Sequence, residues 1–421
     1  MSDVLFGGND LSGVTTRRVA LHFAGQVFDE WTRIEIVRSI DDISGSFSLE
    51  LRDGVRSIST WPFATLAGLA HRSDLWSEVK LTIDGETVLI GWMDEIDPFA
   101  GEGQAFVSCS GRDKTGDLVD CAATVDGPAE YRNVTVLEAA KRICKPFGIA
   151  VRADADVGEP FDRVAIDPGE TAMSAIEKLA RQRALIITSD GVGGLLLTRS
   201  GKTRASGTLT FPGNVTESGG AFSARDRYSE YVVKGQAEKA GGARSKTATL
   251  DATAEPLTSD QSEAISRQAA REEKGVSIVG RAKDSEVTRY RPIVSLGRTQ
   301  LTAKGAQTQA NWMMRTARAR SENLDLSVLD FRSSGALWRP NTLVAVDDSY
   351  QDINRDMLIS GVTYTADEQG CATRLHLTGP EAYDVEPEEE RRRNHRRSRR
   401  KSGSSKGATG KLDSTAERLP E

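Results

Sequence analysis

The chain has 421 residues with 55 Lys and Arg, 61 Asp and Glu, 4 His and 4 Cys, and its formal net charge is −6. This length predicts two to four domains, and the absence of any run of 18 apolar residues excludes a transmembrane helix. The start of the sequence lacks the pattern of a signal peptide, and the sparse cysteines lack CxxC spacing. We therefore expect a protein made in the reducing cytoplasm.

Residues 1–116 are predicted to form a first β domain. Polar and apolar residues alternate from residue 15 to 54, with Gly, Asp and Ser at turn positions. This period of two is typical of antiparallel strands in a sandwich or barrel. The Asp84-Gly85 pair predicts a hairpin. Further strands are expected at 78–83, 87–94 and 104–111.

Residues 117–203 are predicted to form a small α/β module. Thr135 and Glu138 have the spacing of a capping box at the start of a helix, and Pro146 ends that helix. Thr171 begins a second predicted helix. Short apolar strands are expected after each helix and in a closing hairpin, at 148–151, 184–188 and 194–198.

Residues 204–385 are predicted to form a second β domain with helical insertions. A flexible loop is expected at 238–256, and helices are expected at 258–273 and 302–322. Strands are expected at 207–211, 230–235, 325–331, 343–347, 357–365 and 371–377.

Residues 386–421 contain almost no apolar side chains and are predicted to be a disordered basic tail. Eleven basic and seven acidic residues give this tail a charge of +4, so the remaining 44 basic and 54 acidic residues give residues 1–385 a charge of −10. An acidic body is the opposite of what a duplex-DNA-binding domain presents.

Candidate chemical sites in the sequence favour structural interpretations. The carboxylates at 94, 95 and 97 and at 154 and 156 lie beside turns, where Asp is favoured for local hydrogen bonding. His22, His71, His376 and His395 are far apart, and three cysteines are interpreted as small buried apolar residues, namely Cys109, Cys121 and Cys144. Residues 191–194 precede a strand, whereas a phosphate loop precedes a helix. We therefore predict a protein that is not an enzyme, with no catalytic residue, metal or cofactor.

Two groups of residues are candidates for contact with partners. In the predicted helix 302–322, side chains that can contact a neighbouring subunit are Trp312, Met313, Arg315 and Arg318; the alternative is a helix packed on its own barrel. Strands 33–38 and 343–347 are expected at sheet edges, where they can pair between subunits. The basic run in the tail either contacts a polyanion or is simply solvated. Its residues are Arg391, Arg392, Arg393, Arg396, Arg397, Arg399, Arg400 and Lys401.

Four segments, in order, resemble the Mu-like family of phage baseplate hub proteins, which is related to the hub part of type VI secretion spikes. The first is SGRDKTGDLVDC at 110–121, and the second is YVVKGQ at 231–236. The third is LWRPNTLV at 337–344, followed by LISGVTY at 358–364. The last is TRLHLTGPEAY at 373–383. Together they cover roughly residues 15–385, whereas the tail after Glu386 departs from the family pattern.

The resemblance implies an α+β, mainly β protein, with two tail-tube-like antiparallel β-barrels, the α/β module between them and helical insertions. It implies a structural hub in the virion tail baseplate of a contractile tail. There a homotrimer adapts a sixfold tail tube to a threefold central spike, with baseplate wedge proteins around it and DNA passing through the lumen without specific binding. The alternatives are a cell-wall-binding or cell-wall-degrading tail component and, from the basic run alone, a nucleic-acid-binding protein.

Overall fold

The computed structural model describes residues 18–23, 25–29, 31–53, 75–101, 104–125, 130–236, 277–297, 302–367 and 369–385. All of them belong to the first of two units into which the chain divides, Met1–Glu388 and Glu389–Glu421. No helix in this described part is long and apolar enough to cross a membrane. The predicted loop at 238–256, the predicted helix at 258–273 and the predicted tail at 386–421 lie outside the described residues.

The amino-terminal β region is an antiparallel sheet in the order β3-β4-β7-β6-β5-β1-β2. The predicted hairpin is confirmed, because Asp84 and Gly85 both adopt positive φ between β5 and β6. Two glycines let β6 and β7 approach each other. A Cβ on Gly91 would lie 1.8 Å from the carbonyl oxygen of Arg112, and one on Gly111 would lie 2.0 Å from that of Trp92. The strands are β1 (Val19–Phe23), β2 (Gln26–Phe28), β3 (Arg33–Ser39), β4 (Ser46–Asp53), β5 (Glu78–Ile83), β6 (Glu86–Gly101) and β7 (Gln104–Asp113).

The carboxyl-terminal β region has the order β14-β18-β23-β22-β21-β13, in which only the β13–β21 pair is parallel. Its buried side chains alternate with exposed ones, as along β18. A short hairpin of β19 (Arg332–Ser333) and β20 (Ala336–Leu337) interrupts it. The main strands are β13 (Thr203–Phe211), β14 (Val215–Phe222), β18 (Glu322–Leu329), β21 (Thr342–Asp348), β22 (Ile353–Asp367) and β23 (Gly370–Thr378).

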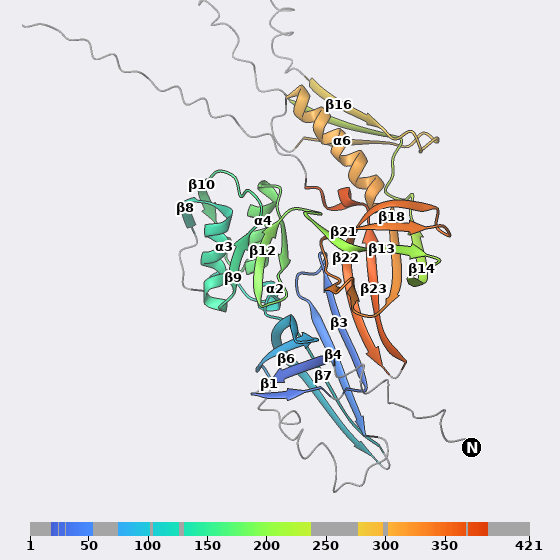
Figure 1. Cartoon of the computed structure of the whole chain (residues 1–421). Helices are drawn as coiled ribbons and strands as arrows, with labels where there is room; N and C mark the ends of the chain where they lie inside the picture. The colour runs from blue at the N-terminus through green and yellow to red at the C-terminus, as the bar shows by residue number, and fades with distance from the viewer. Residues whose placement is uncertain are drawn as a thin grey trace, which may run out of the picture. The chain divides into compact units, whose positions relative to one another are not determined.

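The two β regions are joined edge to edge into one 13-stranded sheet. Gly361–Ala366 of β22 pair with Ser39–Ile34 of β3, and Figure 1 shows these orange and blue strands side by side. One hydrophobic core runs from Val19 and Ile36 to Tyr364 and Leu377. The prediction of edge strands at 33–38 and 343–347 is wrong. Both strands have partners on two sides within the chain, because the joint covers β3 and β13 covers β21.

The α/β module forms a separate core between the β regions in sequence. The predicted capping box is confirmed: the Thr135 hydroxyl accepts a hydrogen bond from the Glu138 N–H, and the Glu138 carboxylate accepts one from the Thr135 N–H. Thr171 caps the second predicted helix. The elements are α2 (Gly116–Asp120), β8 (Glu130–Val134), α3 (Val136–Cys144), η5 (Lys145–Phe147), β9 (Ala150–Ala153), β10 (Phe161–Ala165), α4 (Ala172–Gln182), β11 (Ile186–Ser189) and β12 (Gly194–Thr198).

A third, small core lies between helix α6 (Ala303–Arg320) and a three-stranded sheet. The sheet order is β16-β15-β17, with β15 (Glu230–Gln236), β16 (Ser277–Lys283) and β17 (Pro292–Leu296). The Gln307 side chain donates to the Arg281 carbonyl at 2.7 Å and accepts from the Arg281 N–H at 3.2 Å. It thus binds the two backbone groups that a further strand would otherwise bind. The helix thus covers an edge of β16. The chain then ends its described part after η6 (Pro380–Tyr383).

Candidate functional site

An ion-pair network connects the two β regions beside the shared core. Arg18 binds Asp84 at 2.7 Å and Asp330 at 2.8 Å, and Arg332 binds Asp84 at 3.0 Å and Glu86 at 3.1 Å. The hydrogen bond from Arg18, aided by the one from Arg332, outweighs burial and lowers the pKa of Asp84 from 3.8 to about 2. The network therefore fixes the turn between β5 and β6 against the segment that follows β18.

We expect the joint to weaken in acid. The folded-state pKa of Asp84 is depressed, so its contribution is complete above its unfolded pKa near 3.8 and is lost as the pH falls through about 2. The Asp84 side chain is 32% exposed, so solvent screening leaves roughly 1 kcal/mol. Urea unfolding of the wild type and Asp84→Asn should differ by this amount at pH 6 and converge near pH 2. An equal difference at both pH values would contradict the assignment.

A buried polar cluster connects the first β region to the α/β module. Asp113, at the end of β7, accepts a hydrogen bond from the Ser189 hydroxyl at 2.7 Å and from the Thr115 N–H at 2.9 Å. Arg38 of β3 donates to the Ser189 carbonyl at 3.2 Å. Gly191 adopts a φ of +76°, and a Cβ there would lie 2.5 Å from the Arg38 guanidinium carbon. Burial raises the pKa of Asp113 and lowers that of Arg38.

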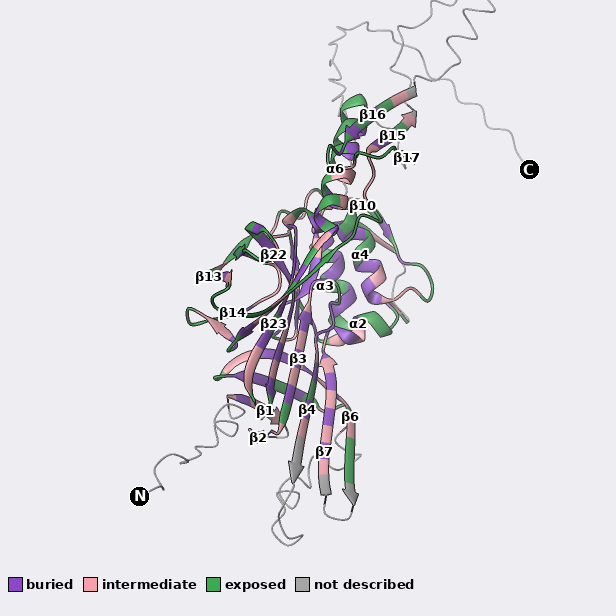
Figure 2. Ribbon diagram, turned by 90° about the vertical axis from the view of Figure 1, so that its right-hand side faces the viewer, coloured by how far each residue is buried: buried purple, intermediate pink, exposed green. Residues whose placement is uncertain are grey.

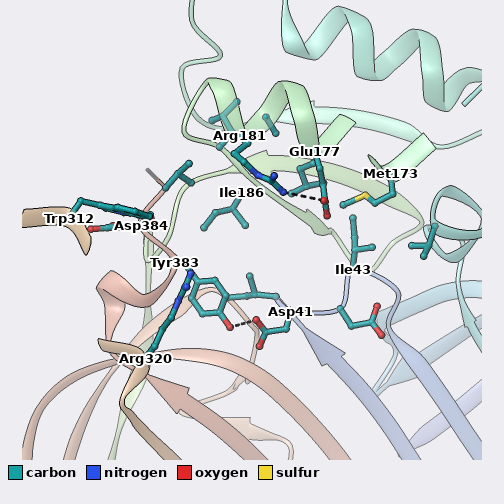
Figure 3. Close-up of a pocket in the computed structure, with 17 residues that line it drawn as sticks. Asp41, Ile43, Met173, Glu177, Arg181, Ile186, Trp312, Arg320, Tyr383 and Asp384 are labelled. Carbon is teal, nitrogen blue, oxygen red and sulfur yellow. Dashed lines mark hydrogen bonds and ion pairs between the residues drawn. The ribbon is translucent and has the colours of Figure 1, made fainter. Parts of the chain in front are cut away.

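A cleft of about 620 Å³ lies where the turn after β3, helix α4 and the end of the described chain come together. In Figure 3 Asp41 points toward Tyr383, whose hydroxyl donates to it at 2.6 Å, and Arg181 reaches back to Glu177 at 3.6 Å. The lining mixes such charged groups with Met173, Ile186 and other apolar residues. The carboxylates Asp41 and Glu177 in this lining are each bound by a neighbouring side chain, Tyr383 and Arg181 respectively.

The helix residues predicted to contact a partner bind other parts of their own chain. The Trp312 indole N–H donates to the Asp384 carbonyl at 2.8 Å, and Arg315 lies 3.7 Å from the Asp384 carboxylate. Met313 packs against the small core of α6, and Arg318 forms an ion pair with Glu286. Their role in contacts with a partner stays a prediction. The basic run 391–401 lies outside the described residues.

The solvent face of the joined sheet is polar and rich in carboxylates. Alternation along the strands places on it the carboxylates Glu35, Glu50, Glu95, Asp97, Glu217 and Asp325, against the guanidinium groups of Arg33, Arg112 and Arg374. Ser110 donates to Glu95 at 3.0 Å, Ser327 donates to Glu217 at 3.1 Å, and His376 contacts Asp325. His376 thus lies on the surface of β23, opposite Asp325 of β18. Negative charge prevails over the described part of this face.

Sequence reasoning missed both the joint and the buried cluster. Arg38 was available as a signal, because it shares strand parity with the buried Ile34 and Ile36. A basic residue at a core position indicates a partner in the interior. The ion pairs of Asp84 with Arg18 and Arg332 join residues up to 248 positions apart and have no local signal.

Comparisons with known proteins relate most of the chain to phage tail proteins. Residues 18–113 match the family described as Mu phage baseplate assembly protein GpP-like, N-terminal, and residues 302–386 match the fourth domain of Mu phage baseplate assembly protein GpP. Residues 115–199 match the second domain of the family described as baseplate hub protein gp44-like. The chain is 31% identical to baseplate hub protein gp44 of Escherichia phage Mu over 380 residues, which cover 89% of this chain and 91% of that protein.

Solved structures give the same relationship. The 43 kDa tail protein of prophage MuSo2 from Shewanella oneidensis has a TM-score of 0.69 and 30% identity, with 87% of this chain and 99% of that chain covered. A tail protein from Neisseria meningitidis MC58 has a TM-score of 0.65 and 21% identity, with 88% and 99% covered. The second likeness concerns the fold alone.

Proposed function

This chain belongs to the family of Mu-like phage baseplate hub proteins, and we propose that it acts as a homotrimer that adapts a sixfold tail tube to a threefold central spike. It is a structural protein of the tail baseplate. The observation that carries the proposal is the edge-to-edge joint between two β regions with the same order of five strands. Three copies supply six such regions, and each feature that differs between the regions occurs three times.

The parts that differ between the two β regions would give a ring of three copies its threefold symmetry. The α/β module bonds to the first β region through Asp113 and Ser189, whereas α6 and its small sheet are inserted into the second. A ring of three copies would therefore carry six similar β surfaces for a tail tube protein and three copies of each appendage. We assign the central spike and the baseplate wedge proteins to the appendages. The division into domains at 1–116, 117–203 and 204–385 belongs to this proposal.

The charge of the joined sheet fits a channel for DNA. If the solvent face with Glu35, Asp97 and Asp325 lines the lumen, like charge opposes binding of phosphate and lets duplex DNA pass. No catalytic step is required of this role.

The proposal is tested by the absolute mass of the purified protein in solution. Light scattering of the full chain and of residues 1–385 is expected to give three times 45.6 kDa for the full chain and a trimer for the shortened chain. The basic tail is expected to be dispensable because both β regions, which the proposal places in the ring, lie within residues 19–378. A monomer at every concentration up to the millimolar range, also in the presence of the spike protein, would contradict the proposal.

A further inference from the structure

The two β regions are structural repeats of each other. Strands β3-β4-β7-β6-β5 correspond in order and direction to β14-β18-β23-β22-β21, and every neighbouring pair in both series is antiparallel. Each long hairpin also contains an irregularity at the same place. The β6–β7 register shifts between Met93 and Glu95, and the β22–β23 register shifts between Ile359 and Gly361. These shifts align Glu95 with Gly361.

The corresponding strand edges differ in one respect, which is whether they have a partner. After its shift, β22 continues from Gly361 to Asp367, and its outer edge pairs with β3. After its own shift, β6 continues from Glu95 to Gly101, yet no strand among the described residues pairs with that outer edge. The counterpart of β3 is β14, which is the last strand at its end of the described sheet.

The two open edges are exposed and contain apolar side chains. Figure 2 shows the far half of β6 largely in green, and Phe99 there is 48% exposed. On β14, Phe222 is 55% exposed beside the flat run Gly219, Gly220 and Ala221. An unprotected edge of this kind is a template for pairing with another chain.

We propose that Glu95–Ala100 of β6 pair antiparallel with β14 of a second copy of this chain, in the register that Gly361–Ala366 use with β3. This rests on the proposed function only in requiring several copies. The intrachain pair Thr363–Val37 corresponds to Asp97 opposite Ala221, and Thr365–Glu35 corresponds to Phe99 opposite Gly219. The joint is heterologous, so repetition closes a ring when the rotation per copy divides a full turn.

The side chains that meet in this register are compatible. Val362–Arg38 corresponds to Ile96 opposite Phe222, on the core side of the sheet, so the exposed ring of Phe222 gains an apolar partner. Phe99 lies opposite a glycine, where its ring meets no competing side chain. Glu217 falls opposite Gly101, two pairs beyond Phe99, so no carboxylate faces another directly.

The register is tested by cysteine cross-linking of the full chain. The background is Cys121→Ser with Cys371→Ser, because Cys121 is exposed and Cys371 is half-buried, whereas Cys109 and Cys144 are buried. Asp97→Cys with Ala221→Cys places the two Cβ atoms across one strand pair, within reach of a disulfide or a short bismaleimide. Val37→Cys with Thr363→Cys is the positive control inside one chain. Asp97→Cys with Glu217→Cys shifts one partner four residues along the same strand, roughly 13 Å.

In non-reducing gels we expect most of the Asp97→Cys, Ala221→Cys chains to migrate as covalent dimers and trimers, with nothing larger. The shifted pair is expected to stay at the level of the single-cysteine variants. Equal cross-linking of both pairs would overturn the register. A trimer by light scattering without a cross-link, while the positive control reacts, would overturn this inference and leave the proposed function intact. A monomer without a cross-link at every concentration up to the millimolar range, also in the presence of the spike protein, would contradict both, and a ladder beyond three copies would contradict ring closure.

Discussion

Asp113→Ala is expected to lower the free energy of unfolding by about 3 kcal/mol, because it removes one member of a buried network that holds another charge. Asp113 is 1% exposed and accepts hydrogen bonds from Thr115 and Ser189. Without this carboxylate, the hydroxyl of Ser189 loses its acceptor and the buried guanidinium of Arg38 loses its nearby negative charge. Urea unfolding at pH 7, followed by tryptophan fluorescence and circular dichroism, measures the loss.

Asp113→Asn is the matched control. Asparagine has the same shape and keeps a side-chain oxygen that can accept from the Thr115 N–H. Because burial raises the pKa of Asp113, the ionised carboxylate is disfavoured there, and a neutral amide avoids that cost. We expect Asn to cost about half as much as Ala. A cost below roughly 0.5 kcal/mol for Ala would mean that the cluster does not hold the α/β module to the first β region.

Gly280→Val is expected to destabilise the packing of α6 on its sheet by about 3 kcal/mol or more. A Cβ on Gly280 would lie 2.1 Å from the carbonyl oxygen of Ala306 and 2.5 Å from the backbone nitrogen of Gln307. These atoms belong to the helix backbone, so the helix itself must move. The movement also breaks the two hydrogen bonds between the Gln307 side chain and Arg281. Thermal melting and limited proteolysis of the variant should reveal an early local transition.

Gly219→Ala is the control for this substitution. It also adds a side chain to a strand glycine, but its Cβ meets no atom closer than 3.5 Å. Because Gly219 lies in β14, away from α6, we expect no early local transition in this variant and a proteolysis pattern of α6 and its sheet that matches the wild type. If Gly280→Val melts like the wild type, α6 does not contact β16 as closely as described.

Local features of the fold could be predicted from the sequence because their signals are local. The capping box at Thr135, the turn at Asp84-Gly85 and the cap of α4 at Thr171 each depend on residues within four positions of one another. Strand β14 was not predicted, since its Ser-Gly-Gly-Ala run has low strand propensity. It forms because β18 pairs with it along its whole length.

The arrangement of the sheet could not be predicted from the same patterns. Alternation identifies β3 as a strand with one buried face, but hydrophobic periodicity does not specify which strand lies at each edge. From the sequence we expected the edge of β3 to lie at a boundary between subunits. In the structure β22 of the same chain pairs with that edge. The candidate surfaces depend on this choice, because an edge that is filled within one chain is closed to another.

The pairing of β3 with β22 also has a consequence for folding during translation. Strand β3 leaves the ribosome about 320 residues before its partner Gly361–Ala366 exists. Translation at roughly 5–20 residues per second makes this an interval of tens of seconds. During that time the amino-terminal region presents an open edge and half of a core, as a folding intermediate does. The sheet and its core can therefore be completed only after β22 has been made. A nascent chain on a ribosome stalled before codon 353 should still be cleaved by proteases and bound by chaperones.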